Sequence, residues 1–195
     1  MNSIVRAGGN AVRFMQKLPA AEGRQFMILH PIPPVYNAES EVLILGSFPS
    51  VKSRETGFFY GHPQNRYWKV LAAVFGEEVP GTIPEKRAFL LRNHIAAWDV
   101  IQSCEITGSS DASIRDVVPN DLSQILRTAQ IRQIFVNGRT AEKMYRRYTE
   151  PVTGRACVCL PSTSPANAAW SLDRLIEAWK IVPQSAHSAE GERTA

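Results

Sequence analysis

Short apolar runs alternate along the chain with segments whose apolar residues recur at helical spacing. Residues 42–45 (Val-Leu-Ile-Leu) form a continuous apolar run that Gly46 ends, which is typical of a strand buried on both faces. Similar runs cover residues 131–136 and 156–160, and a shorter one covers residues 95–101. The spacing of apolar residues predicts helices over residues 66–75, 84–92, 121–129, 138–148 and 171–181. Strands that alternate with helices in this way predict a single three-layer α/β/α domain on a central, mostly parallel sheet.

The periodic pattern covers residues 30–182, which we expect to be the folded domain. Residues 1–29 are rich in Ala, Gly and Arg and hold four basic side chains against one acidic, so we expect a basic, poorly ordered extension there. Residues 183–195 form a polar C-terminal tail by the same reasoning. No run approaches the roughly 18 apolar residues of a membrane-spanning helix, so we expect a soluble protein with no membrane partner.

The charge of the chain leaves its partner open. The sequence holds 22 Lys and Arg against 18 Asp and Glu, for a net charge of +4. Within residues 30–182, basic side chains outnumber acidic ones only by 17 to 15. Any affinity for nucleic acid must therefore come from a local arrangement of charge, because the domain has no strong overall field.

Three cysteines, Cys104, Cys157 and Cys159, indicate free thiols rather than a disulfide framework. Cys157 and Cys159 alternate with Val158, so both point to one face of the predicted strand. An odd number of cysteines in a domain of this size is typical of small core residues in a reducing compartment, here the cytoplasm or the nucleoid. The sequence has no cluster of four cysteines for zinc or an iron–sulfur centre, so we expect neither a metal nor a cofactor.

Three of the predicted strands end in unusual polar sequences. These are residues 46–50 (Gly-Ser-Phe-Pro-Ser), 137–138 (Asn-Gly) and 161–165 (Pro-Ser-Thr-Ser-Pro). In a parallel sheet the carboxyl ends of the strands meet at one edge, and ligands bind there. The sequence therefore predicts a functional site at this edge, with Asn137 either part of it or only the first residue of an Asn-Gly turn.

The first of these segments continues into a stretch rich in aromatic and basic residues. Lys52, Arg54 and Arg66 are interleaved with the rings of residues 58–60 and 67–68. This combination suits a site that stacks a flat ring and neutralises a nearby phosphate, although the same rings could fill the core behind the loop. The third segment has two prolines that stiffen it, and its hydroxyl and backbone N–H groups could hold phosphate oxygens or form a simple turn.

The two segments together resemble the motifs of the uracil-DNA glycosylase superfamily. Residues 46–49 (Gly-Ser-Phe-Pro) lie where that superfamily has its Gly-x-Asn/Asp-Pro motif, after the first central strand. Residues 56–70 (Thr-Gly-Phe-Phe-Tyr-Gly-His-Pro-Gln-Asn-Arg-Tyr-Trp-Lys-Val) resemble the Thr-Gly-Phe…His-Pro-x-Asn-Arg-Phe-Trp stretch of its mismatch-specific branch. Residues 160–164 (Leu-Pro-Ser-Thr-Ser) resemble its Pro-Ser-x-Ser second motif. The similarity covers nearly all of residues 42–180 and implies a uracil-DNA glycosylase-like fold and a hydrolase that acts on N-glycosyl bonds in DNA.

One position departs from the superfamily pattern. The Asn or Asp that activates water in the first motif is Phe48 here, and a phenyl ring cannot orient water. The Gly-Ser-Phe-Pro-Ser form, with an asparagine in the His-Pro-x-Asn block, resembles the hypoxanthine-DNA glycosylase (DNA-deoxyinosine glycosylase) branch. The resemblance implies that Asn65 takes over as the catalytic residue.

The chemistry of base removal is compatible with an asparagine in this role. Cleavage passes through an oxocarbenium-like sugar while the departing base gains negative charge, so the enzyme must extrude the nucleotide and place a water near C1′. The side-chain carbonyl of Asn65 could hold that water, because an oxocarbenium ion is reactive enough for positioning to suffice. No lysine lies inside either motif to form a Schiff base, so we expect a monofunctional enzyme with no lyase step.

The resemblance also implies a base-binding pocket. Tyr60 aligns with the aromatic residue that stacks on the base, and Ser47 and Phe48 would lie at the pocket floor. Asp99 ends a predicted strand, and its carboxylate could accept a hydrogen bond from N1–H of hypoxanthine or N3–H of uracil, or it could cap a helix or anchor a loop. His62 is a secondary candidate, as a general acid or as a structural residue.

The remaining polar residues of the two motifs imply contacts with DNA. Hydroxyl groups of the second motif would grip the phosphates beside the damaged base: Ser162, Thr163 and Ser164. Lys52 and Arg66 are candidate phosphate contacts. The expected partner is double-stranded DNA that contains a deaminated base, and no obligate protein partner is implied.

The sequence therefore predicts a DNA glycosylase of base excision repair that removes deaminated bases, hypoxanthine first and uracil second, and leaves an abasic site. A uracil-specific enzyme of the mismatch branch is the alternative among enzymes. A non-catalytic nucleic-acid-binding module of the same fold is the alternative from a different class, and Phe48 is the residue that keeps it open.

Overall fold

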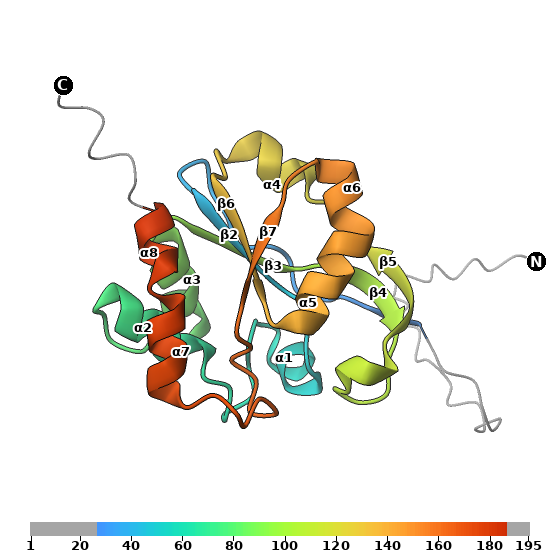
Figure 1. The fold of residues 1–195 in the computed structure, drawn as a ribbon, viewed down its shortest axis with the longest axis horizontal. Helices are drawn as coiled ribbons and strands as arrows, with labels where there is room; N and C mark the ends of the chain where they lie inside the picture. The colour runs from blue at the N-terminus through green and yellow to red at the C-terminus, as the bar shows by residue number, and fades with distance from the viewer. Residues whose placement is uncertain (1–26, 187–195) are drawn as a thin grey trace, which may run out of the picture.

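The chain folds around a four-stranded parallel sheet with helices on both faces (Figure 1). The computed structural model describes residues 27–186, and residues 1–26 and 187–195 lie outside this part. The strands of the parallel sheet, in spatial order, are β3 (Ile95–Asp99), β2 (Val42–Gly46), β6 (Gln133–Asn137) and β7 (Cys157–Leu160). This is the three-layer α/β/α architecture that the sequence predicts.

Side chains of the central strand β2 alternate between two hydrophobic cores. Val42 and Ile44 point into one core, and Leu43 and Leu45 point into the other. Burial on both faces explains why β2 is a continuous apolar run instead of an alternating one.

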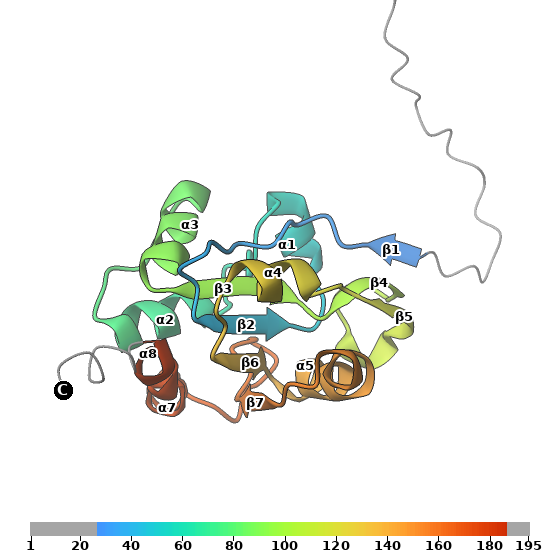
Figure 2. The ribbon, with the colours of Figure 1, turned by 90° about the horizontal axis from the view of Figure 1, so that it is seen from above.

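Each core is closed by its own group of helices. One is covered by α2 (Tyr67–Phe75), α3 (Ile83–Arg92), α7 (Leu172–Trp179) and α8 (Ile181–Ala186). The other is covered by α4 (Ser123–Thr128), α5 (Arg139–Met144) and the wider helical turn that follows α5 at Tyr145–Thr149 and leads into α6 (Glu150–Thr153). Figures 1 and 2 show α2, α3, α7 and α8 on one side of the sheet and α5 on the other.

A second, antiparallel sheet extends one edge of the domain. It consists of β1 (Met27–Leu29), β4 (Ile101–Glu105) and β5 (Arg115–Pro119), with β4 in the middle. The apolar run over residues 95–101 thus contains β3 and the start of β4, joined at Val100. The sequence analysis does not predict this sheet, because β1 has three residues and β5 is largely exposed without regular alternation.

The described structure reaches beyond the limits expected for the domain at both ends. Strand β1 lies within the expected N-terminal extension, and α8 continues to Ala186, past the expected boundary at residue 182. The rest of the predicted extension and tail, residues 1–26 and 187–195, lies outside the described residues. Helix α1 (Val51–Thr56) and a 3₁₀ turn at Asp111–Ser113 are two further short elements that the sequence pattern does not indicate.

The four parallel strands end at one edge of the sheet. Gly46 lies opposite Asp99 where β2 pairs with β3, and Asn137 lies opposite Leu160 where β6 pairs with β7. The polar segments that follow these strands therefore meet at a common rim, as predicted.

Within residues 27–186, no helix is both long and apolar enough to cross a bilayer. In that same part of the chain, no three His, Cys, Asp or Glu side chains are grouped so that they could hold a metal ion. The cysteines are free thiols, with Cys104 buried and Cys157 and Cys159 half-buried on β7.

Candidate active site

A cavity of about 470 Å³ opens at the rim where the parallel strands end. Its volume lies in the range of small-molecule sites. Most residues that the sequence predicts for the site line it: Ser47, Phe48, Tyr60, His62, Asn65, Asp99, Ser162, Thr163 and Ser164. Asn137 and Asp111 line it as well, whereas Lys52 and Arg66 do not.

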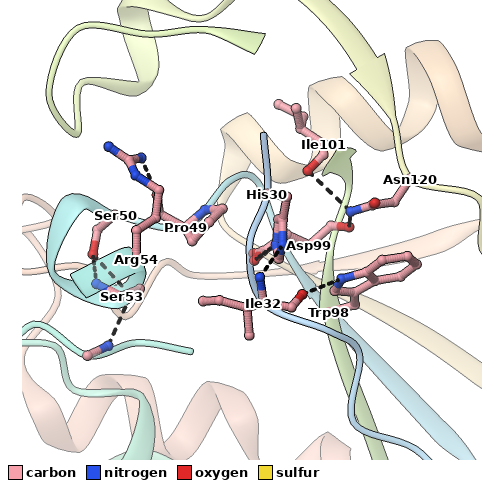
Figure 3. A network of polar contacts seen from close by, with 11 residues as sticks. His30, Ile32, Pro49, Ser50, Ser53, Arg54, Trp98, Asp99, Ile101 and Asn120 are labelled. Carbon is pink, nitrogen blue, oxygen red and sulfur yellow. Dashed lines mark hydrogen bonds and ion pairs between the residues drawn. The ribbon is translucent and has the colours of Figure 1, made fainter. Parts of the chain in front are cut away.

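Helix α1 fixes the loop that follows β2. Ser50 caps α1, because its Oγ accepts a hydrogen bond from the Ser53 N–H at 3.2 Å (Figure 3). The Oγ of Ser53 accepts a further bond from the Gly61 N–H at 3.0 Å, and the Arg54 guanidinium donates to the Pro49 carbonyl at 2.8 Å. These bonds tie the first motif to the aromatic segment that follows it.

Phe48 makes this part of the cavity wall apolar. Its buried ring meets the ring of His30 edge to face, with 5.9 Å between centroids, and the Arg54 guanidinium lies 5.6 Å from its centroid. It offers no group that could hold a water, so the polar chemistry of the site must come from other strands.

Tyr60 and Tyr67 form a stacked pair beside the cavity. Their ring centroids lie 3.7 Å apart and the ring planes differ by 20°, so only the opposite face of Tyr60 could stack on a base. The hydroxyl oxygen of Tyr67 is buried without a hydrogen-bond partner among residues 27–186, and that of Tyr60 is buried near the side chain of Asn137. Burial raises the pKa of both hydroxyls well above the usual value, with a smaller contribution from the negative charge of Asp99. Both rings therefore stay neutral at physiological pH.

Asn65 is linked through Thr163 to Asn137. The Nδ2 of Asn137 donates to Thr163 Oγ1 at 2.9 Å, and Thr163 Oγ1 donates to Asn65 Oδ1 at 3.0 Å. Backbone N–H groups fix which way each amide points, because Thr163 N–H donates to Asn137 Oδ1 at 3.0 Å and Tyr67 N–H donates to Asn65 Oδ1 at 3.0 Å. The three side chains therefore form one oriented network across β6, the second motif and the start of α2.

This network determines which atoms of Asn65 are free. The carbonyl oxygen of Asn65, which the sequence predicts to hold a water, already accepts two hydrogen bonds. The Nδ2 of Asn65 has no partner among the described residues, so the amide presents donors to the cavity.

The network also gives Thr163 a role in the fold. This residue is fully buried, with 0% of its surface exposed, and its hydroxyl bridges the two asparagines. Because the hydroxyl is buried and paired with both asparagines, it orients Asn65 in this structure, and a contact between Thr163 and a DNA phosphate stays a prediction.

Arg66 holds the second motif in place. Its guanidinium donates to four backbone carbonyls of the segment after β7: those of Thr163 (3.3 Å), Ser164 (2.7 Å), Asn167 (3.0 Å) and Trp170. These bonds use most of its donors and direct them into the protein. Arg66 therefore has a structural role in the fold, and its contact with a DNA phosphate stays a prediction.

The other predicted DNA contacts and the secondary candidate His62 keep free donors. Ser162 Oγ accepts from the Ser164 N–H at 3.2 Å, and the hydroxyl protons of both serines have no acceptor among the described residues. The Nδ1 of His62 accepts from the Gln64 N–H at 3.2 Å, which leaves the proton of the neutral ring on Nε2. Lys52 is exposed outside the cavity and pairs with Glu55 at 2.8 Å.

Asp99 lies deep in the cavity, directly over Gly46. A Cβ at Gly46 would overlap Asp99 Oδ1, so the glycine makes room for the carboxylate. The Oδ2 atom accepts a hydrogen bond from His30 Nε2 at 2.7 Å (Figure 3). The Oδ1 atom has no donor among residues 27–186, and Asp99 therefore offers an acceptor to whatever fills the cavity.

The segment after β4 closes another side of the cavity. Ser47 Oγ donates to Asp111 Oδ1 at 3.3 Å, and Ser109 Oγ accepts from the Val51 N–H at 3.0 Å. Burial raises the pKa of Asp111, although hydrogen bonds from Thr140 and Ser47 oppose the shift. Ser47 thus contacts this segment as well as lining the pocket.

Three site residues are missing from the sequence-based assignment or ambiguous in it. The position of Asn137 at the end of a predicted strand indicates a site residue, but an Asn-Gly turn explains the same position equally well. Asp111 lies in a polar loop with no motif. His30 is 69 residues away from Asp99 in sequence, and no local pattern indicates the contact.

Comparisons with known proteins show which family and fold this chain is similar to. The family model described as "Uracil DNA glycosylase superfamily" matches residues 33–183. A Methanosarcina acetivorans protein named hypoxanthine DNA glycosylase is 35% identical over 161 residues, which cover 80% of this chain and 98% of that protein. A protein of the same name from Methanosarcina barkeri is 34% identical over 109 residues, 55% of this chain and 69% of that protein. The solution NMR structure of a Methanosarcina acetivorans protein assigned as a uracil DNA glycosylase superposes with a TM-score of 0.70 at 31% identity, over 83% of this chain and 100% of that one.

Proposed function

The chain belongs to the uracil-DNA glycosylase superfamily and is a DNA glycosylase that acts on deaminated bases; from this premise we propose that its preferred substrate is deoxyinosine in double-stranded DNA. The enzyme hydrolyses the bond between C1′ and N9 of hypoxanthine and leaves an abasic site. Deoxyuridine is a second and poorer substrate. The two relatives named hypoxanthine DNA glycosylase support this choice, and the substrate implies that the protein works in the cytoplasm or nucleoid.

The observation that carries the proposal is the acceptor offered by Asp99 Oδ1. Hypoxanthine presents N1–H on the edge where adenine presents a bare nitrogen lone pair. A carboxylate oxygen accepts a hydrogen bond from the first and repels the second. Asp99 therefore favours the deaminated purine over the adenine from which it arises.

The size of the cavity favours a purine over a pyrimidine. Uracil also presents a ring N–H, at N3, which the same carboxylate accepts. Uracil is smaller, however, and covers less of the free face of Tyr60 in a cavity of about 470 Å³. The weaker contact makes deoxyuridine the poorer substrate.

Asn65 is the catalytic residue in this proposal, and it acts through its Nδ2 donor. As the C1′–N9 bond breaks, its electron pair moves to the base and the sugar becomes an oxocarbenium ion. A hydrogen-bond donor fixed in advance by Tyr67 and Thr163 stabilises the negative charge on the departing base. Water then attacks C1′ and loses a proton to solvent, without a covalent enzyme intermediate.

Contacts with the DNA backbone come from donors at the rim of the cavity. Ser162, Ser164 and His62 line the cavity, and their free hydroxyl protons and Nε2–H are the donors that we assign to the DNA backbone. Lys52 adds a positive charge on the exposed face of α1.

A cleavage assay tests the proposed function. Labelled duplexes carry one deoxyinosine, one deoxyuridine or one deoxyadenosine at the same position, and strand scission is measured with and without alkali. We expect scission at deoxyinosine that requires alkali, a slower reaction at deoxyuridine and none at deoxyadenosine.

The other outcomes separate the alternatives. Scission at deoxyuridine alone overturns the hypoxanthine preference and leaves a uracil-specific enzyme. Scission without alkali overturns the monofunctional mechanism. Duplex binding without scission of any substrate overturns catalysis and leaves a nucleic-acid-binding module.

A further inference from the structure

His30 is a buried histidine for which the proposed reaction has no role. Its side chain is 2% exposed, and it lies in the segment that directly follows β1. Figure 3 shows its ring against Asp99 at the end of β3. The distance from His30 Nε2 to Asp99 Oδ2 is 2.7 Å, and this contact joins the segment after β1 to a buried carboxylate that lines the cavity.

Hydrogen bonds define the tautomer of His30. The Nδ1 atom accepts a hydrogen bond from the Ile32 N–H at 3.2 Å, so Nδ1 carries no proton. A ring without a proton on Nδ1 carries one on Nε2, and Nε2–H then donates to Asp99 Oδ2. His30 is therefore a neutral donor, which stabilises the carboxylate without cancelling its charge.

The segment after β1 makes a second hydrogen bond with β3. The Trp98 indole N–H donates to the Ile32 carbonyl at 3.1 Å, next to the contact between His30 and Asp99 (Figure 3). Behind Asp99, the amide of Asn120 donates to the Asp99 carbonyl at 2.9 Å. Hydrogen bonds therefore fix Asp99 both through its carboxylate and through its backbone carbonyl.

We propose that His30 is a positioning residue for base selection: it holds Asp99 by Oδ2 so that Oδ1 accepts a hydrogen bond from the base. The inference rests on the proposed function, because it assigns to Asp99 the recognition of a ring N–H. With Oδ2 held by His30 and Gly46 beneath Oδ1, the carboxylate has one free acceptor and one orientation. A base with a bare nitrogen at that edge, such as adenine, meets a lone pair instead of a donor.

The groups around Asp99 leave His30 as its one donor among the described side chains. Tyr60 and Tyr67 face it from the aromatic segment and from α2, and their raised pKa keeps both hydroxyls neutral. Asp111 is the other nearby carboxyl, and the charge of Asp99 contributes to its raised pKa. Without the His30 donor, the Asp99 carboxylate loses the hydrogen bond that fixes its orientation.

A matched pair of variants tests the proposal. In His30→Gln an amide N–H can reach the place of Nε2–H, whereas His30→Met has similar length but no donor. Single-turnover cleavage of a deoxyinosine duplex is measured at pH 7, together with cleavage of a deoxyadenosine duplex and the thermal midpoint of each variant. We expect His30→Met to lose about 10- to 100-fold in rate, because Asp99 Oδ2 loses its donor. His30→Gln should stay within about fivefold of the wild type, because its amide restores a donor.

The Asp99→Asn background shows whether His30 acts through Asp99. There, adding His30→Met should change the rate less than about twofold, because the two residues form one unit. Equal losses in His30→Met and His30→Gln, or independent effects of His30→Met and Asp99→Asn, overturn the proposal and make His30 a packing residue. A wild-type protein that cleaves only deoxyuridine overturns the proposed substrate, whereas an active wild type with an unchanged His30→Met variant overturns this inference alone.

Discussion

At the scale of single residues, Gly46 leaves the least freedom for change. An added Cβ would overlap Asp99 Oδ1 and lie 3.2 Å from the Tyr60 hydroxyl oxygen, while His30 holds the other side of the carboxylate. We expect Gly46→Ala to lose at least about tenfold in deoxyinosine cleavage and about 1–3 kcal/mol in the free energy of unfolding measured with urea. Both effects follow because the carboxylate must turn away from the base.

Gly57 provides the control for this substitution. It ends α1 with a φ of 71° and has no atom within 4 Å of an added Cβ. Gly57→Ala should therefore cost about 1 kcal/mol of stability through backbone strain and leave the cleavage rate within about twofold. A Gly46→Ala enzyme as active as Gly57→Ala would contradict the placement of Asp99.

The atom through which Asn65 acts can be tested with Asn65→Asp. An aspartate keeps an oxygen for the Tyr67 N–H and the Thr163 hydroxyl but replaces the Nδ2 donor with an acceptor. Because the departing base needs a donor, we expect Asn65→Asp to lose about 100-fold or more in single-turnover rate, as Asn65→Ala does. An Asn65→Asp enzyme close to wild type would instead assign the residue to water activation by an oxygen.

Single-residue patterns predict which side chains line the cavity but not how they pair. Asn65, Asp99 and Ser162 follow from motifs and strand ends, and the structure brings all three to the cavity. The bonds that define their roles join distant positions, such as Thr163 to Asn65 and His30 to Asp99. Pairings of this kind depend on the tertiary fold. For this reason the sequence predicts a phosphate contact for the hydroxyl of Thr163, whereas the structure places that hydroxyl in the protein interior.

At the scale of elements, Arg66 joins the start of α2 to the loop after β7. Its planar guanidinium serves four carbonyls at once, which a lysine ammonium cannot do. We expect Arg66→Lys to lower the free energy of unfolding by about 2–3 kcal/mol and to slow cleavage, because the loop that carries Thr163 loosens. Lys52→Met is the control: its exposed pair with Glu55 is worth less than about 0.5 kcal/mol. Equal stability of the two variants would contradict this role.

Glu77 joins the end of α2 to α3 and predicts a pH effect on stability. Partial burial favours a raised pKa, but hydrogen bonds from Arg92 and from Asn93 Nδ2 (2.6 Å) outweigh it and hold the pKa of Glu77 below its usual value. A carboxylate with a lowered pKa stabilises the fold above its unfolded pKa and loses that contribution as the pH falls through the folded value.

The variant Glu77→Gln should therefore be less stable than the wild type by about 0.5–1 kcal/mol at pH 7. Urea denaturation should show this difference shrinking towards zero as the pH falls through the lowered pKa of Glu77, where the wild-type carboxyl takes up its proton. A difference that does not change with pH would mean that packing, and not charge, connects the two helices.

Elements with a strong period are predicted well, and short ones are not. Strand β2 and helix α2 have their apolar positions dictated by two-sided and one-sided burial, so their bounds agree with the sequence to within a residue. Strands β1 and β5 have few buried positions and depend on pairing with β4. Pairing with β4 determines these strands, and the local pattern of apolar residues does not indicate that pairing.

At the scale of the whole molecule, the active site depends on every parallel strand. The strands β3, β2 and β6 deliver Asp99, Gly46 and Asn137 to one rim, and the loop after β7 adds Thr163. The parallel direction of these strands follows from the alternation of strands and helices in the sequence. The antiparallel sheet adds His30, so a segment outside the repeated pattern reaches the centre of the site.

The most direct test of this account is the single-turnover rate of wild type and Asn65→Ala on a duplex with one deoxyinosine, measured with the dissociation constant of each protein for that duplex. We predict a loss of about 100-fold or more in rate with a dissociation constant within about threefold, because Asn65 acts on the transition state and the rim donors bind the DNA. An unchanged rate, or a loss of rate explained by an equal loss of binding, would contradict the central role of Asn65.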